Sequence, residues 1–154
     1  MKAEQYKVDD YIFHISDTVL DIMKSFIQDA KWKPESGGIL LGQVKDKQVY
    51  VQKASVPCLF DRGSRYAFHR DKAAAQIIVN YEFVNSSRTV TYLGEWHTHP
   101  EEYPNPSPQD LRMINGQHAL GELHIPFLIM AIQGISGRYV GMYKNNHLSK
   151  AVKL

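Results

Sequence analysis

This sequence has one cysteine, no long apolar run and almost no excess charge of one sign, and each absence excludes a class of protein. A single thiol, Cys58, cannot close an internal disulfide, which argues against a disulfide-stabilised secreted scaffold. Because Cys58 has apolar neighbours, we expect it to be buried. No apolar run approaches the roughly 18 residues of a membrane-spanning helix, and the polar N-terminal residues do not resemble a signal peptide. We therefore expect a cytoplasmic protein with no membrane partner.

The charge balance gives no sign of a nucleic-acid partner. There are 18 basic and 16 acidic residues, a net charge of +2, and no run of like charge. Domains that bind nucleic acid normally carry a basic patch or stripe, so we expect no nucleic acid to bind here. The length of 154 residues fits one domain, spanning 1–154. A domain of this size buries about 70% of its unfolded surface and needs no cross-links.

The apolar pattern alternates between the two regular kinds of secondary structure. Runs rich in β-branched and aromatic residues predict strands at 11–15, 35–44, 48–54, 65–70, 89–93 (continuing to His99), 127–132, 138–144 and 148–154. Helical spacing and capping residues predict helices at 17–31, 71–85 and 107–118. This mixture predicts an α/β fold in which helices pack on a sheet of mixed strand direction.

Two histidines near the end of one expected strand form the most informative local pattern. His97 and His99 are two positions apart, so their side chains leave the same face of the strand, with backbones about 7 Å apart. Pro100 then ends the strand, because it has no N–H to donate. The geometry suits two imidazoles that bind one metal ion. Roughly 0.3 His-x-His pairs are expected by chance at this histidine content, so the pair alone is a weak motif.

Asp110, eleven residues after His99, can supply a third ligand. Ser107 is a good helix N-cap, and Pro108 is favoured at the first helical position. Asp110 then lies in the first helical turn, where its charge also suits the helix dipole. Two histidines and one carboxylate leave a fourth tetrahedral position open. That is the pattern of a catalytic rather than a structural zinc site.

The full pattern, His-x-His-Pro-x6-Ser-x2-Asp after a strand, resembles the signature of the JAMM (MPN-plus) metallopeptidase family. Every position of that signature is present. The resemblance implies the cytidine-deaminase-like JAMM/MPN fold, a mixed α/β sheet with helices packed on it. It also implies one zinc ion held by His97, His99 and Asp110, and a peptidase or isopeptidase in which Ser107 supports the oxyanion.

Such a reaction still requires a general base, and Glu35 is the candidate. The family places a glutamate beside a glycine-rich turn on an earlier strand, and the run Glu35-Ser36-Gly37-Gly38 resembles that element. Glycines weaken strands, so a pair of them suggests close approach by a ligand or another chain. The resemblance implies that Glu35 accepts a proton from the attacking water and gives it to the departing amine. Glu95 is a nearer competitor, but it lies one step below the ligands on their strand, so we expect a supporting or surface role.

The family's usual substrates are the C-terminal tails of ubiquitin-like proteins, and an extended tail can add to an exposed sheet edge. The short loop 101–106 leaves no room for the chain-recognition insertion of larger eukaryotic members. The chain therefore looks most like the stand-alone bacterial deconjugating peptidases of CBASS anti-phage operons. That likeness implies a substrate conjugated by a ubiquitin-transfer-like enzyme, with the C-terminus of a cyclic-oligonucleotide synthase as one candidate.

Three other interpretations remain open. One is a JAMM peptidase that acts on a ubiquitin-like or sulfur-carrier protein in another bacterial pathway. Another is a non-catalytic MPN scaffold, although such scaffolds normally lose the ligand residues that are present here. The third is a DNA-associated relative of the RadC type, which the weak net charge argues against. His118, His124 and His147 lie outside any ligand spacing, so we expect them to be structural or surface residues.

Overall fold

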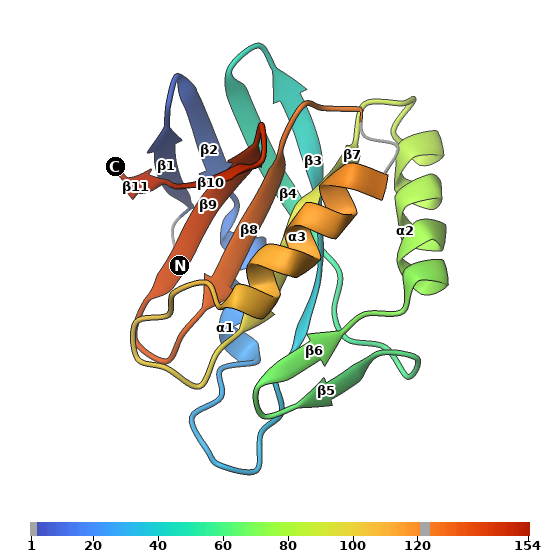
Figure 1. Cartoon of the computed structure of the whole chain (residues 1–154). Helices are drawn as coiled ribbons and strands as arrows, with labels where there is room; N and C mark the ends of the chain where they lie inside the picture. The colour runs from blue at the N-terminus through green and yellow to red at the C-terminus, as the bar shows by residue number, and fades with distance from the viewer. Residues whose placement is uncertain (1–2, 121–123) are drawn as a thin grey trace.

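The structure is a computed structural model that describes residues 3–120 and 124–154. In this described part of the chain, nine strands form one curved sheet (Figure 1). In spatial order they are β10 (His147–Lys150), β9 (Arg138–Lys144), β8 (Leu128–Gln133), β7 (Thr91–Thr98), β3 (Gly37–Lys45), β4 (Gln48–Ala54), β2 (Tyr11–Ile15), β1 (Glu4–Val8) and β11 (Val152–Lys153). β7 runs parallel to β8 and β2 runs parallel to β4, whereas the other pairs are antiparallel.

Three helices cover the two faces of this sheet in the described residues. α1 (Asp17–Ser25) buries Val19, Leu20 and Met23 in the main core on one face. α2 (Lys72–Asn85) and α3 (Pro108–Leu120) pack on the other face, through clusters that include Ala75 and Ile114. Successive side chains of each central strand point to opposite faces of the sheet, so both faces carry apolar residues. The α/β fold with a mixed sheet is confirmed.

The first helix is shorter than its apolar pattern predicts. It ends at Ser25, and residues 26–36 form neither helix nor strand. Phe26 leaves the helix and packs against Trp96, with ring centroids 5.8 Å apart. Tertiary contacts of this kind override helix propensity, so the expectation of a helix to residue 31 was wrong.

A small hairpin replaces the single strand expected at 65–70. It consists of β5 (Arg62–Ser64) and β6 (Ala67–His69), joined by a turn at Arg65 and Tyr66. Its first strand lies against the segment before β3, because the amide of Glu35 donates a hydrogen bond of 2.7 Å to the carbonyl of Ser64. The hairpin therefore forms one wall beside Glu35.

A bulge in β7 decides which face of the sheet receives the histidines. The register between β3 and β7 shifts at Leu93, next to Gly94. Gly94 cannot carry a side chain, since an added Cβ would lie 2.0 Å from the carbonyl oxygen of Ile129. Beyond the bulge, Trp96 packs in the core on the α1 face together with Leu93, whereas His97 turns toward α3.

The C-terminal segment joins the two ends of the sheet. β10 pairs with β9, Ala151 continues that pairing through a bond to Val140, and β11 then pairs with β1. The strand expected at 148–154 is thus divided between both edges, and its partner β1 had no element assigned to it from the sequence. We call β1, β9 and β11 the C-terminal seam.

Cys58 is exposed, so the expectation that it is buried was wrong. The loop at 55–61 lies outside the sheet, and the amide of Cys58 bonds to the carboxylate of Asp61. Leu59 and Phe60 are exposed as well, with 99% and 73% of their surface accessible. Apolar neighbours in sequence therefore do not imply burial here. Among the described residues, no helix combines the length and the apolar character needed to cross a bilayer.

Candidate metal centre and active site

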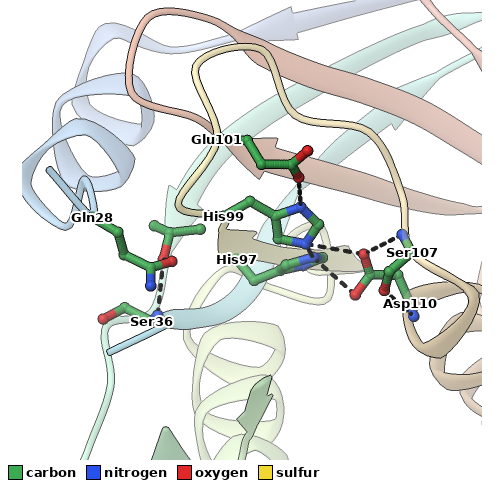
Figure 2. Close-up of polar contacts among 8 residues, drawn as sticks. Gln28, Ser36, His97, His99, Glu101, Ser107 and Asp110 are labelled. Atoms are coloured by element: carbon green, nitrogen blue, oxygen red, sulfur yellow. Dashed lines mark hydrogen bonds and ion pairs between the residues drawn. The ribbon is translucent and has the colours of Figure 1, made fainter. Parts of the chain in front are cut away.

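β7 brings the two histidines together at the edge of the α3 face (Figure 2). His97 lies in the strand opposite Gly37 of β3, and His99 follows directly after the strand ends at Thr98. Both side chains are buried, and their Nε2 atoms are 3.2 Å apart. An added Cβ at Gly37 would lie 2.5 Å from the carbonyl oxygen of Trp96. The glycine expected to mark a close approach therefore lets β3 pack against the histidine strand of its own chain.

Asp110 reaches the histidines from the first turn of α3. Ser107 and Asp110 form a reciprocal cap: the Ser107 amide donates to the Asp110 carboxylate at 2.8 Å, and the Asp110 amide donates to the Ser107 hydroxyl at 3.1 Å. The two carboxylate oxygens lie 3.1 Å from His97 Nε2 and 3.1 Å from His99 Nε2. Burial alone raises the pKa of Asp110, but the bonds to His97 and His99 outweigh it and hold that pKa well below its usual range.

The separations between these atoms fit a tetrahedral metal ion. Ligands about 2.05 Å from zinc in tetrahedral geometry are about 3.3 Å apart. Here the two Nε2 atoms are 3.2 Å apart, and each lies 3.1 Å from a different oxygen of Asp110. Where two imidazole nitrogens face each other, only one proton can lie between them. A single cation can accept electron pairs from both nitrogens and from the carboxylate. The residues present could therefore hold a metal.

Glu35 completes the cluster from the segment before β3. One oxygen of Glu35, one nitrogen of each histidine and one oxygen of Asp110 all lie within 4.8 Å of one another. Glu35 is 5% exposed, and burial raises its pKa to about 8, an effect that the charge of Asp110 adds to and that of His99 opposes. A cation bound beside it lowers that pKa, because it favours the ionised form.

A family model described as prokaryotic homologues of the JAB domain matches residues 22–141. The chain belongs to the JAB-domain family. The resemblance to the JAMM signature is therefore confirmed, and with it the expectation of a JAMM-type peptidase at the level of the family. The five residues predicted for its site lie together in the JAB domain: Glu35, His97, His99 and Asp110 are buried, and the half-buried Ser107 bonds to Asp110.

Three curated relatives of this JAB domain share one name. The protein named CD-NTase/cGAS isopeptidase from Pseudomonas aeruginosa is 36% identical over 99 residues, 64% of this chain and 63% of that protein. A protein of the same name from Escherichia coli is 31% identical over 148 residues, 95% of this chain and 92% of that protein. The chain thus spans slightly less than two thirds of the first relative and nearly all of the second.

A solved structure supports the fold alone. The solution structure of protein DSY2949 from Desulfitobacterium hafniense superposes with a TM-score of 0.61. The alignment covers 88% of this chain and 87% of that one, at 15% identity. The arrangement of sheet and helices in this JAB domain is therefore shared with a protein of quite different sequence.

Glu95 lies on the same strand face as the histidines but is bound elsewhere. Its carboxylate accepts a bond of 2.6 Å from Arg70 Nε, and Arg70 also donates to Gln117 on α3. Both charged side chains are largely buried. Burial raises the pKa of Glu95, and the charge of Arg70 opposes that shift. In this JAB domain Glu95 is a buried ion-pair partner that joins β7 to Arg70, the residue after β6, rather than the surface group that was one of the two expected roles.

A residue that sequence reasoning missed contacts His99 from the loop. Glu101 accepts a bond of 2.8 Å from His99 Nδ1, which leaves Nε2 free to face the cluster. A carboxylate two positions after a ligand histidine is the only signal that the sequence offers for this contact. Of the five other histidines, the three expected to be structural or surface residues lie outside the cluster. His124 stacks on Phe83 at the surface, His118 packs edge-on against Tyr143, and His147 is exposed in β10.

A cavity of about 290 Å³ opens beside the cluster. One wall is the β5–β6 hairpin, with Tyr66 and Phe68, and the other is α3, with Arg112 and Met113. Glu35, His97 and Asp110 line its floor, next to the Arg70–Glu95 pair. A chain segment that enters this cavity therefore reaches the candidate metal ligands directly.

Proposed function

We propose that this JAB domain, acting as a single domain, is a zinc-dependent isopeptidase of bacterial anti-phage (CBASS) defence. It cleaves after the C-terminal tail of a protein conjugated by a ubiquitin-transfer-like system. The observation that carries the proposal is the convergence of Glu35, His97, His99 and Asp110 within 4.8 Å in a JAB domain. The relatives named as CD-NTase/cGAS isopeptidases support a CD-NTase as the conjugated protein.

Zinc is the metal that suits this donor set, with His97, His99 and Asp110 as its three protein ligands. Two imidazole nitrogens and one carboxylate that lie this close together are typical of catalytic zinc sites. When bound, zinc supplies a Lewis acid that activates water and polarises a carbonyl. Glu101 orients His99 by holding its Nδ1 proton, so that Nε2 is the nitrogen that faces the ion.

Glu35 carries the protons in this proposal. Its buried carboxylate accepts a proton from the attacking water and later donates it to the departing lysine amine, so that the amide bond is replaced by a carboxylate and an amine. Ser107 supports the oxyanion from the start of α3. Capping uses a lone pair of its hydroxyl oxygen, because the Asp110 amide is the donor. The hydroxyl proton of Ser107 therefore remains available to the substrate.

The test is cleavage of a CD-NTase joined through its C-terminal carboxyl to a lysine side chain, compared between wild type and Glu35→Gln. The substitution keeps the volume and hydrogen bonding of residue 35 but cannot accept the water's proton. We expect cleavage to fall about 10²-fold or more, with zinc content, thermal stability and binding of the uncleaved conjugate close to wild type.

Two other outcomes would overturn parts of the proposal. A wild-type chain that binds the conjugate but never cleaves it is a scaffold rather than a peptidase. A Glu35→Gln variant that cleaves at the wild-type rate while Glu95→Gln is inactive places the base on β7. A second substrate, a ubiquitin-like or sulfur-carrier protein extended at its C-terminus, separates isopeptidase from peptidase activity in the same assay.

A further inference from the structure

A buried glutamine outside the signature lies at the junction of the three segments around Glu35. Gln28 is 1% exposed, in the irregular segment that follows α1. Its Nε2 donates to the carbonyl of Lys33 at 3.2 Å and to the carbonyl of Arg65 at 2.9 Å, and its Oε1 accepts from the hydroxyl of Thr98 at 2.9 Å. A buried amide is costly unless its groups are bonded, and here both ends are used.

The direction of each bond is fixed by chemistry. Two carbonyls can only accept, so the NH2 group of Gln28 must face Lys33 and Arg65. The Thr98 hydroxyl oxygen already accepts from the Ser36 amide at 3.0 Å, so its proton goes to the Gln28 carbonyl. A continuous chain of donors and acceptors therefore runs from the Ser36 backbone through Thr98 to Gln28.

Two members of this chain of bonds are sequence neighbours of the candidate base and of the candidate ligands. Figure 2 draws Gln28 and Ser36 together with the two histidines. Ser36 follows Glu35 directly, and Thr98 lies between His97 and His99 with its side chain on the opposite face of the strand. A backbone bond of 2.9 Å, from the Thr98 amide to the Ser36 carbonyl, joins the same two residues.

The segment that carries Glu35 has little regular structure of its own. Residues 26–36 belong to no helix or strand, and β3 begins only at Gly37. Gln28 bridges this segment to β7 on one side and, through Arg65, to the turn of the β5–β6 hairpin on the other. The hairpin in turn holds the Glu35 amide through Ser64. The position of Glu35 relative to the histidines therefore depends on contacts that converge on Gln28.

We propose that Gln28 is a positioning residue that, through Thr98 and Ser36, sets the place of the Glu35 carboxylate relative to His97 and His99. The inference rests on the proposed function. Gln28 touches neither the ligand atoms nor the substrate. Its loss displaces the base without removing a ligand, and a small misplacement of a catalytic group can cost as much as 10²-fold in rate.

The first test compares variants along the chain of bonds. Gln28→Met keeps the length of the side chain but breaks the network, and we expect kcat to fall about 10-fold or more. KM and zinc content should stay within about 2-fold of wild type, because recognition and ligands are unchanged. Thr98→Val should reproduce this loss, whereas Thr98→Ser, which keeps the hydroxyl, should restore wild-type turnover. The double variant Gln28→Met/Thr98→Val should lose no more than the larger single loss.

The second test asks whether the effect acts through the base. In a Glu35→Gln background, Gln28→Met should change the residual rate less than about 2-fold, since no base is left to position. Amide hydrogen exchange of the metal-free chain gives a second measurement that requires neither bound metal nor catalytic turnover. The Ser36 amide should exchange about 10-fold faster in Gln28→Met and Thr98→Val, and at the wild-type rate in Thr98→Ser.

Gln133→Met is the matched control. Gln133 is also buried, and its side chain bonds to the Gly134 carbonyl and to Arg138 instead of to the Glu35 segment. It should lose comparable stability yet keep kcat within about 2-fold and leave Ser36 exchange unchanged. The inference is overturned if Gln28→Met turns over like wild type, if Gln133→Met loses as much kcat, or if the Gln28→Met loss persists in full without Glu35.

Failure of the proposed function looks different from failure of this inference. If the wild-type chain cleaves no conjugate, the proposed function fails. Ser36 exchange then decides alone whether Gln28 holds the Glu35 segment. If Gln28→Met does not fold, Thr98→Val carries both measurements, and unchanged kcat and exchange in that variant overturn the proposal.

Discussion

The carboxylates at the C-terminal seam and at the candidate metal centre differ in what balances their negative charge. At the seam, Glu4 lies between Arg138 and Lys153, with oxygen–nitrogen distances of 2.5 and 3.0 Å. Burial raises its pKa, but bonds from Tyr6, Arg138 and Lys153 outweigh burial and bring the pKa to about 2. Glu4, Arg138 and Lys153 therefore all have a charged partner within the chain.

At the metal centre the chain supplies no such partner among its described residues. Asp110 pairs with His97 and His99, which are cationic only when protonated, and Glu35 is left with a pKa of about 8. The ion pairs at the seam are complete, whereas the candidate metal centre has carboxylates that a cation from outside would neutralise. We therefore expect the seam to stabilise the fold and the candidate metal centre to bind a ligand.

Removing a ligand tests the incomplete side of this comparison and should have the largest effect. We expect one zinc per wild-type chain, and loss of metal in His97→Ala and Asp110→Asn. Asp110→Asn keeps the shape but removes the negative charge, so activity at limiting zinc should fall at least about 100-fold. Elemental analysis and kcat/KM at limiting zinc measure these effects. Full zinc retention by both variants would sink the ligand assignment, and chelation should abolish activity without unfolding the wild type.

Breaking the seam should instead lower stability and leave the site intact. Arg138→Met removes one partner of a largely buried pair but leaves Lys153 and Tyr6 bonded to Glu4. We expect a loss of about 2 kcal/mol in the free energy of unfolding, measured in denaturant. Zinc content and kcat should match wild type. A change in zinc affinity without a change in stability would contradict the division between the two regions.

Glu101 tests how far the metal centre depends on its supporting contacts. Its side chain is half exposed, so the effect should be at the low end for such partners. We expect Glu101→Ala to weaken zinc binding about 10-fold, because His99 loses the bond that fixes its ring. Glu102→Ala is the control, since that neighbouring carboxylate bonds to Ser136 instead. Equal zinc affinity in all three proteins would show that His99 needs no such support.

The smallest effect is a pH dependence of the metal-free protein. The pKa of Glu35 rises from 4.5 to about 8 on folding, so the folded state holds this proton more tightly. Its contribution is fully present below pH 4.5 and is lost as the pH rises through about 8. Glu4 has the opposite sign, because its pKa falls to about 2 and its contribution is lost as the pH falls toward that value.

The measurement is the free energy of unfolding of metal-free wild type and Glu35→Gln from pH 5 to 8. The gap between them should change in favour of the variant by about 1 kcal/mol as the pH rises, since solvent in the cavity screens the charge. Zinc should abolish this trend. Parallel curves without zinc would mean that Glu35 is ionised at neutral pH in the metal-free fold.

The site residues that are close in sequence could be predicted from their spacing, whereas those brought together by long-range packing could not. His97, His99, Ser107 and Asp110 occur within fourteen residues, so strand and helix geometry alone place them together. Glu35 is sixty-two residues from His97 and could be named only through the family resemblance. Where these residues lie in the fold agrees with the prediction, while their roles remain proposals.

The misses share one cause. α1 ends early because Phe26 packs on Trp96, and Gln28 is buried because it bonds to residues 37 and 70 positions away. The strand at 148–154 divides because both sheet edges compete for it. None of these contacts leaves a periodic signal in the sequence, so propensity and pattern could not reveal them.

The bulge beside Gly94 decides on which face of the sheet the two histidines lie. Along β7, faces alternate residue by residue, and the one extra position at Leu93 resets the count before His97. Loss of the Leu93 codon alone would straighten the bulge and leave plain alternation from Tyr92 to His97, so the imidazoles would still face α3. During evolution this stretch can therefore lose one residue without turning the signature away from α3, whereas a second loss would turn the imidazoles toward the core around Trp96.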